Sequence, residues 1–144
     1  MATVELRFSA LPEHVRTARL VAAAVARRAG VDEAVLDEVR LAVGEACSRA
    51  VGLHQSHAIT SPVKVSLIEE EKQFSIEVGD EAPHATRHGD TPGAAQNGDA
   101  DDEEDEMGLA VISGLVDDVE VTTGRDGGLI RMTWPATPPA TAVL

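Results

Sequence analysis

Aromatic side chains are nearly missing from this chain, which has two phenylalanines, one tryptophan and no tyrosine among its 144 residues. It therefore lacks the platforms on which proteins stack single-stranded nucleic acids. Basic side chains are few as well: 12 lysines and arginines stand against 25 aspartates and glutamates, so the net charge is -13. Such a charge repels a phosphate backbone, and we expect no direct nucleic-acid partner.

Cysteine occurs once, as Cys47, so an internal disulfide is excluded. It lies in a helical pattern, and we interpret it as a small packed residue in a reducing cytoplasm. Long apolar runs are lacking too: no window approaches the roughly 20 apolar residues of a membrane span. Residues 1–14 also lack the apolar segment of a signal peptide. We therefore expect a cytoplasmic protein without membrane contact.

The length predicts one domain, because 144 residues can bury one core and are short for two. We assign residues 1–135 to this domain and residues 136–144 to a flexible tail. Within the domain, residues 82–106 contain prolines and glycines, no large apolar side chain, and seven acids in the eight positions 99–106. Like charges repel one another and resist burial, so we interpret 82–106 as a disordered insert.

Hydrophobic periodicity predicts a strand and two helices in the first half of the chain. Residues 3–8 alternate between apolar and polar side chains, as in a half-buried strand. A helix is expected over residues 12–29, because proline suits its first turn and Gly30 suits a left-handed C-terminal cap. Asp32 can cap a second helix over residues 36–57, where apolar residues recur every three or four positions.

The second half predicts two hairpins and one helix. Residues 63–78 alternate in two runs on either side of a polar turn, and residues 119–134 do the same around an Arg-Asp-Gly-Gly turn. A short apolar helix is expected over residues 107–116. This order of elements predicts an α+β fold, a two-layer α/β sandwich with about five strands in a mixed sheet and three helices on one face.

The polar face of the long helix carries the first candidate site. Glu45 and Arg49 lie one turn apart; a carboxylate can serve as a general base, whereas arginine has no lone pair for a metal. Their simplest interpretation is an ion pair along the helix. We expect no metal site, because no ligand spacing joins the four histidines between residues 54 and 88. These are His54, His57, His84 and His88.

Five stretches, in this order, together resemble a known family. They are ELRFSALPEHVRTARLVAAAVARRAGVDE, DEVRLAVGEACSRAV, SIEVGDEAP, EMGLAVISGLVDDVEV and GGLIRMTW. The resemblance is to the anti-sigma factors with serine-kinase activity, within the GHKL (Bergerat-fold, histidine-kinase-like) ATPase superfamily. It covers nearly the whole chain up to Pro135 and implies a Bergerat-type α/β sandwich.

The first motif of this family is Glu-x-x-x-Asn on the second helix. In the family the glutamate is a general base toward a serine of the partner, and the asparagine ligates the magnesium that bridges the ATP phosphates. Here Glu45 occupies the first position and Arg49 the second. Arginine cannot replace the ligand, because it has only donors and a permanent charge. The family histidine is also displaced, since Leu53 takes its position and His54 comes one residue later.

Two further family motifs are altered. In Asp-x-Gly-x-Gly/Pro the aspartate binds the adenine amino group; Asp80 matches it, but Ala82 replaces the first glycine. In Gly-x-Gly-Leu free backbone N–H groups hold phosphates; Gly108 remains, whereas Glu106 replaces the first glycine. The acidic run 99–106 corresponds to the lid that closes over the triphosphate in the family. Its negative charges would repel the triphosphate.

The resemblance and these departures indicate an anti-sigma regulator that acts by binding. It would sequester a sigma factor until an anti-anti-sigma protein of the STAS type displaces it, without kinase activity. We expect no cofactor, and ATP with magnesium only if the pocket is still competent. Glu45 is then a vestigial base, and Asp80 and Gly108 are residual nucleotide contacts.

The resemblance also implies a homodimer, formed through the sheet edge and the first helix. We expect the arginines of that helix to contact an acidic partner surface. They are Arg16, Arg19, Arg27 and Arg28.

Other interpretations stay open at this level. One is an active ATP-dependent serine kinase that phosphorylates its anti-anti-sigma partner. Another is a regulatory module that binds a different protein or ligand in the altered pocket. The acidic run 99–106 is either a solvated linker or a mimic of nucleic acid toward a basic partner surface.

Overall fold

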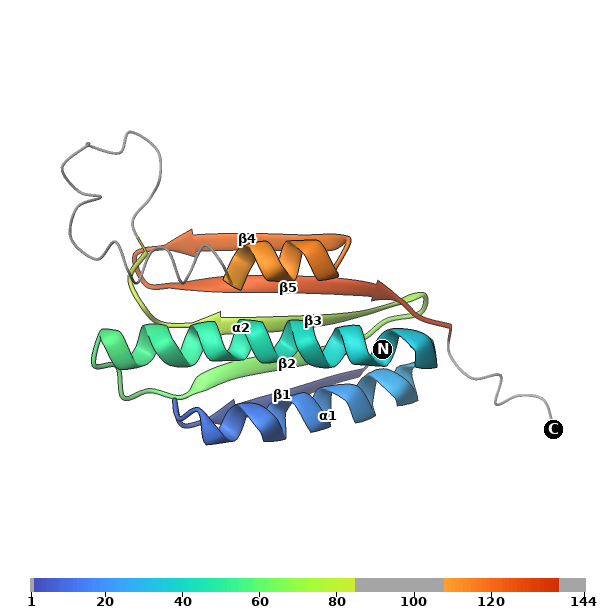
Figure 1. Cartoon of the computed structure of the whole chain (residues 1–144), viewed down its shortest axis with the longest axis horizontal. Coiled ribbons are helices and arrows are strands. Elements are labelled where there is room, and N and C mark those ends of the chain that lie inside the picture. The colour runs from blue at the N-terminus through green and yellow to red at the C-terminus, as the bar shows by residue number, and fades with distance from the viewer. Residues whose placement is uncertain (1, 85–107, 138–144) are drawn as a thin grey trace.

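The computed structural model describes residues 2–84 and 108–137, which form one sheet with helices packed on one of its faces (Figure 1). The strands are β1 (Ala2–Phe8), β2 (Val63–Glu69), β3 (Gln73–Asp80), β4 (Asp118–Gly124) and β5 (Gly127–Pro135). The helices are α1 (Glu13–Ala29) and α2 (Leu36–Ser56), joined by a 3-10 turn (Glu33–Val35), and residues 108–115 are also helical. The predicted α+β two-layer fold is confirmed. Of the predicted insert 82–106, only residues 82–84 belong to the described part.

The five strands lie in the order β1-β2-β3-β5-β4, and every neighbouring pair is antiparallel. The prediction of a mixed sheet is therefore wrong. After β3 the chain passes to the far edge of the sheet, where β4 runs in the same direction as β3. The hairpin then brings β5 back between them, so β5 takes the place beside β3 that a parallel β4 would otherwise fill.

The ends of the helices follow local sequence signals. α1 ends at Gly30, whose φ of 98° is left-handed and whose N–H contacts the carbonyls of Ala26 and Arg27, as predicted. Asp32 accepts a 3.1 Å hydrogen bond from the N–H of Ala34. This capping bond closes the 3-10 turn instead of the first turn of α2, which follows directly.

The core lies between the sheet and α2. Inward-facing strand residues such as Phe74, Ile76 and Met132 are fully buried, and they meet the apolar stripe of α2. Cys47 on this helix is also fully buried, as predicted, and burial raises the pKa of its thiol to about 12. Trp134 donates a 2.9 Å hydrogen bond from Nε1 to Glu38 of α2, which satisfies its one polar atom. Among the described helices, none combines the length and the hydropathy needed to cross a lipid bilayer.

Candidate functional site

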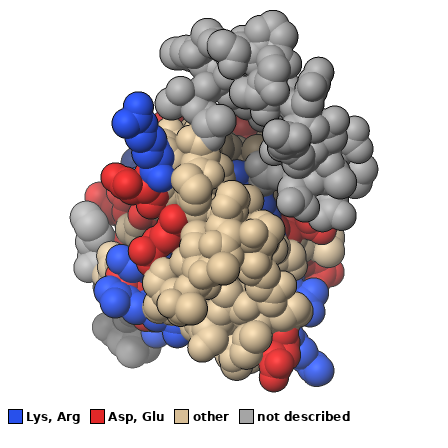
Figure 2. All heavy atoms as spheres, turned by 90° about the vertical axis from the view of Figure 1, so that its left-hand side faces the viewer, with Lys and Arg blue, Asp and Glu red and all other residues tan. Residues whose placement is uncertain are grey.

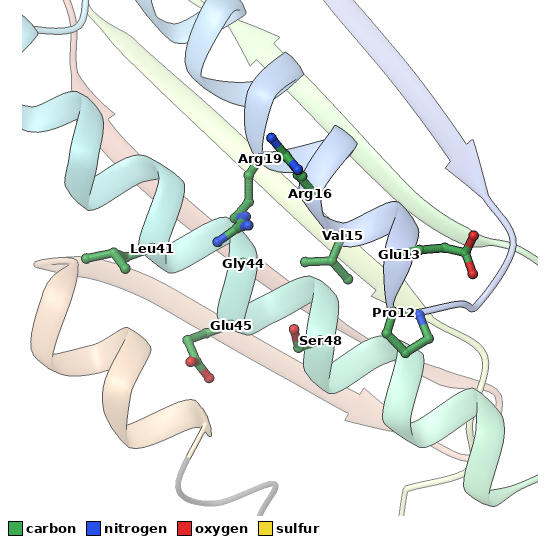
Figure 3. Close-up of a pocket in the computed structure, with 9 residues that line it drawn as sticks. All are labelled: Pro12, Glu13, Val15, Arg16, Arg19, Leu41, Gly44, Glu45 and Ser48. Carbon is green, nitrogen blue, oxygen red and sulfur yellow. The ribbon is translucent and has the colours of Figure 1, made fainter.

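The polar side of α2 faces two different neighbours. Figure 3 shows the Glu45 side chain directed away from α1. A Cβ placed on Gly108 would lie 3.9 Å from Oε2 of Glu45. The structure therefore brings together two of the predicted site residues from distant parts of the sequence. Glu45 is exposed, so its carboxylate is open to solvent at this point.

Arg49 points to another neighbour. Its side chain is 5% exposed, and Nη1 lies 3.6 Å from Oδ2 of Asp80, whose side chain is 1% exposed. Within the described residues, no ion pair links Arg49 to Glu45, so the prediction of an ion pair along the helix is wrong. The observed ion pair between Arg49 and Asp80 joins the middle of α2 to the end of β3. Two predicted site residues thus contact each other directly.

The carboxylate of Asp80 has several partners. Its Oδ1 accepts a 2.9 Å hydrogen bond from the N–H of Ala82, and Nε2 of His84 lies 2.8 Å from the same oxygen. Oδ2 faces Arg49. Both oxygens are therefore engaged by groups of the chain itself. Ala82, which replaces the family glycine, is fully buried beside them.

Two glycines of the β4–β5 hairpin make room for this cluster. Gly127 has a φ of +149°, and a Cβ there would lie 2.2 Å from the carbonyl oxygen of Asp80. A Cβ on Gly128 would lie 2.8 Å from Nε2 of His84 and 2.9 Å from Oδ2 of Asp80. The backbone N–H of His84 also donates a 3.0 Å hydrogen bond to the carbonyl of Gly124. Sequence reasoning assigned these glycines only to a turn, because their contacts with Asp80 depend on the tertiary fold.

His54 connects the end of α2 to two loops. The residue is fully buried, its Nδ1 lies 3.0 Å from the carbonyl oxygen of Ser61, and its Nε2 accepts a 2.9 Å hydrogen bond from the N–H of Glu81. These partners require the neutral tautomer with a proton on Nδ1. Sequence reasoning missed this role, since the only signal was a histidine next to the family position. Both ring nitrogens are engaged; of the other histidines considered as ligands, His88 lies outside the described residues.

A groove of about 530 Å³ lies between α1 and α2 on the outer side of the helices (Figure 3). Arg16 and Arg19 of α1 line it together with residues of α2 that include Leu41, Glu45 and Ser48. The complete lining is Pro12, Glu13, Val15, Arg16, Arg19, Leu41, Gly44, Glu45 and Ser48. The start of α1 lies at the end of the molecule shown in Figure 2, where uncharged side chains fill the middle and charged ones gather at the margin.

The arginines of α1 differ in their partners. Arg27 pairs with Glu33 at 2.9 Å, and Arg28 pairs with Glu69 at 2.9 Å. Across residues 2–84 and 108–137, neither Arg16 nor Arg19 has an ion-pair partner. A Cβ on Gly44 would lie 2.8 Å from Cδ of Arg19, so the side chain of Arg19 crosses α2 where a glycine leaves space.

The antiparallel sheet with helices on one face defines a domain with a GHKL-type ATPase fold. The family model of the histidine kinase-like ATPase domain matches residues 8–134, and the chain belongs to this family.

A solved structure has a similar fold: the crystal structure of the RsbU and RsbW domains of Rv1364c from Mycobacterium tuberculosis. The TM-score is 0.68 at 16% sequence identity, and the match covers 96% of this chain and 33% of that chain. The present chain thus spans about a third of the length of that relative. A search of curated protein sequences returns no significant match.

Proposed function

We propose that this chain is an anti-sigma regulator that binds a sigma factor and keeps it from RNA polymerase. An anti-anti-sigma antagonist of the STAS type would release the sigma factor by competing for an overlapping surface. Membership of the histidine kinase-like ATPase family and the order of the motifs support this function, as does the fold shared with a structure that contains an RsbW domain. The groove between α1 and α2 is the observation that carries the proposal.

The arginines of the groove suit acidic side chains of a partner and Leu41 suits an apolar one, whereas the glutamates of its lining, Glu13 and Glu45, suit basic side chains. Leu41 is 55% exposed at its α2 side, and Arg16 and Arg19 bring two positive charges into a chain whose net charge is -13. Because Arg27 and Arg28 already pair with acids of the same chain, we assign partner binding to Arg16 and Arg19 and not to all four arginines. Charge complementarity of this kind sets the choice of partner and the rate of association.

We further propose that the chain works without kinase activity. At position 49 a magnesium ion would need an oxygen ligand, whereas the guanidinium offers only donors and a positive charge. At position 80 the carboxylate that family members use for adenine is engaged by Ala82, His84 and Arg49. The residues present therefore do not fit magnesium-ATP, and we derive no catalytic step through it.

An active serine kinase is the second candidate. One observation favours it: Glu45, at the position of the family's general base, keeps an exposed carboxylate next to Gly108. A homodimer is part of either proposal, and the position of β1 at one edge of the sheet supports it, because an edge strand offers unpaired backbone groups.

Co-purification from the source cell, followed by mass spectrometry, tests the proposed function. We expect a sigma factor among the captured proteins. With that sigma factor purified, Arg16→Glu and Arg19→Glu should each weaken binding by about tenfold or more. Arg27→Glu is the matched control, since Arg27 lies on the same helix outside the groove. Equal losses in all three variants, or capture without any sigma factor, would contradict the proposal.

A further inference from the structure

The contacts around Asp80 come from three separate parts of the fold. Arg49 comes from the middle of α2, Ala82 and His84 from the segment after β3, and Gly128 from the start of β5. Three groups of the chain itself surround this carboxylate, whose side chain is 1% exposed, so a further donor has little access to it. An incoming amino group would first have to displace Ala82, His84 or Arg49.

Burial makes such a displacement costly. Breaking a buried pair leaves an uncompensated charge in a low-dielectric site, which destabilises a fold far more than the loss of an exposed pair. Arg49 is 5% exposed and His84 10% exposed at the side chain, so neither partner can turn toward solvent without rearrangement. Gly127 and Gly128 restrict the arrangement further, because the backbone of the β4–β5 hairpin packs directly against Asp80.

We infer that Arg49, Asp80 and His84 form an internal latch, which fills the adenine end of the family's nucleotide pocket and stabilises the fold without nucleotide. The latch is an autoinhibitory contact: the chain's own donors take the positions on Asp80 that a purine amino group would need. The inference shares with the proposed function only the absence of nucleotide chemistry. It makes no use of the groove or of any sigma factor.

Thermal unfolding of the full chain tests the latch. For the wild type we expect a Tm shift below about 1 °C with 5 mM ADP or with 5 mM ATP and magnesium, because a ligand that does not bind the folded state cannot stabilise it. Arg49→Ala should lower the Tm by about 10 °C and His84→Ala by about 5 °C, since each leaves Asp80 with a missing partner. His84→Gln retains a donor and should recover most of the loss.

Matched controls separate the latch from general effects of substitution. Arg40→Ala removes an arginine of α2 that pairs with Asp37 on the surface, and His57→Ala removes an exposed histidine; both should leave the Tm nearly unchanged. A variant that combines His84→Ala with Ala82→Gly, called the opened variant, removes the His84 donor and the Ala82 methyl group beside Asp80, and its Tm should rise by about 2 °C or more with ADP. If it does not fold, His84→Ala alone is used for this measurement.

Three outcomes would overturn the inference: a wild-type Tm that rises with nucleotide, latch variants no less stable than their controls, or an opened variant that folds without any response to ADP. None of these outcomes changes the expected sigma-factor affinities, which depend on Arg16 and Arg19. Conversely, if Arg16→Glu and Arg19→Glu did not weaken sigma-factor binding, the expected Tm values would remain the same. The failure of one proposal can therefore be distinguished from the failure of the other.

Discussion

Arg49 of α2 and Asp80 of β3 form a buried ion pair with Nη1 3.6 Å from Oδ2. In the family that this chain resembles, the first of these positions serves the magnesium ion and the second serves adenine. Here the two side chains face each other. The side chain at one motif position therefore occupies an oxygen of the side chain at the other.

We predict no phosphate transfer to an anti-anti-sigma partner with magnesium-ATP. The reason is the guanidinium at position 49, which has only donors and therefore cannot ligate magnesium. Incubation of both proteins with radiolabelled ATP, followed by gel analysis of the partner, measures phosphate transfer directly. Robust transfer that disappears in Glu45→Ala would establish the active kinase instead, because Glu45 would then act as the base.

Replacement of Gly127 by alanine should strongly destabilise the fold. The new Cβ would lie 2.2 Å from the carbonyl oxygen of Asp80, and the φ of +149° is unfavourable for any other residue type. We expect a loss of about 3 kcal/mol or more in the free energy of unfolding, measured by urea denaturation.

Gly52→Ala is the matched control for Gly127→Ala. Gly52 lies in α2 with nothing within 4 Å of the added Cβ. Since alanine favours helix more than glycine does, this variant should gain about 0.5–1 kcal/mol. A Gly127→Ala protein as stable as the wild type would mean that the hairpin does not pack against Asp80 as described.

Much of this fold could be predicted from local patterns. The strand at β1, the span of α1 and the left-handed cap at Gly30 each depend on residues that are neighbours in the sequence, so periodicity and capping rules were sufficient. The direction of the strands was not predictable in the same way. Whether the sheet is mixed or antiparallel depends on where β5 inserts, and no local pattern records that position.

In the candidate site, too, the sequence predicted which residues take part but not which residues contact one another. Sequence reasoning identified Glu45, Arg49, Asp80 and Gly108, because the resemblance supplied their positions. It paired Arg49 with Glu45, the nearest acid on the same helix face. The observed partner comes from the end of β3, where burial and the shape of the hairpin decide which charges meet. His84 was placed in the insert for a similar reason: composition indicated mobility, whereas its contact with Asp80 arises only in the folded chain.

Gly44→Ala should weaken partner binding more than it lowers stability. The added methyl group would lie 2.8 Å from Cδ of Arg19, and the end of a flexible side chain can move away at small cost. The side chain of Arg19 would then leave its position over α2, and only Arg16 would keep its position in the groove. We expect about tenfold weaker binding of the sigma factor with a Tm within about 2 °C of the wild type. Unchanged affinity would show that the position of Arg19 does not matter for the partner.

The buried thiol of Cys47 should make stability depend on pH in the alkaline range. Burial raises its pKa from 9.0 to about 12, so the folded chain favours the neutral thiol more strongly than the unfolded chain does. This contribution is complete below pH 9.0 and is lost as the pH rises toward 12, because only the unfolded chain releases its proton in that window. Urea denaturation under reducing conditions should therefore show the wild type losing about 2 kcal/mol more than Cys47→Ala between about pH 8 and about pH 10.5. The chain has no tyrosine, so no phenol titrates in the same range. Parallel pH profiles for the two proteins would show that Cys47 ionises equally in both states and is not protected by the core.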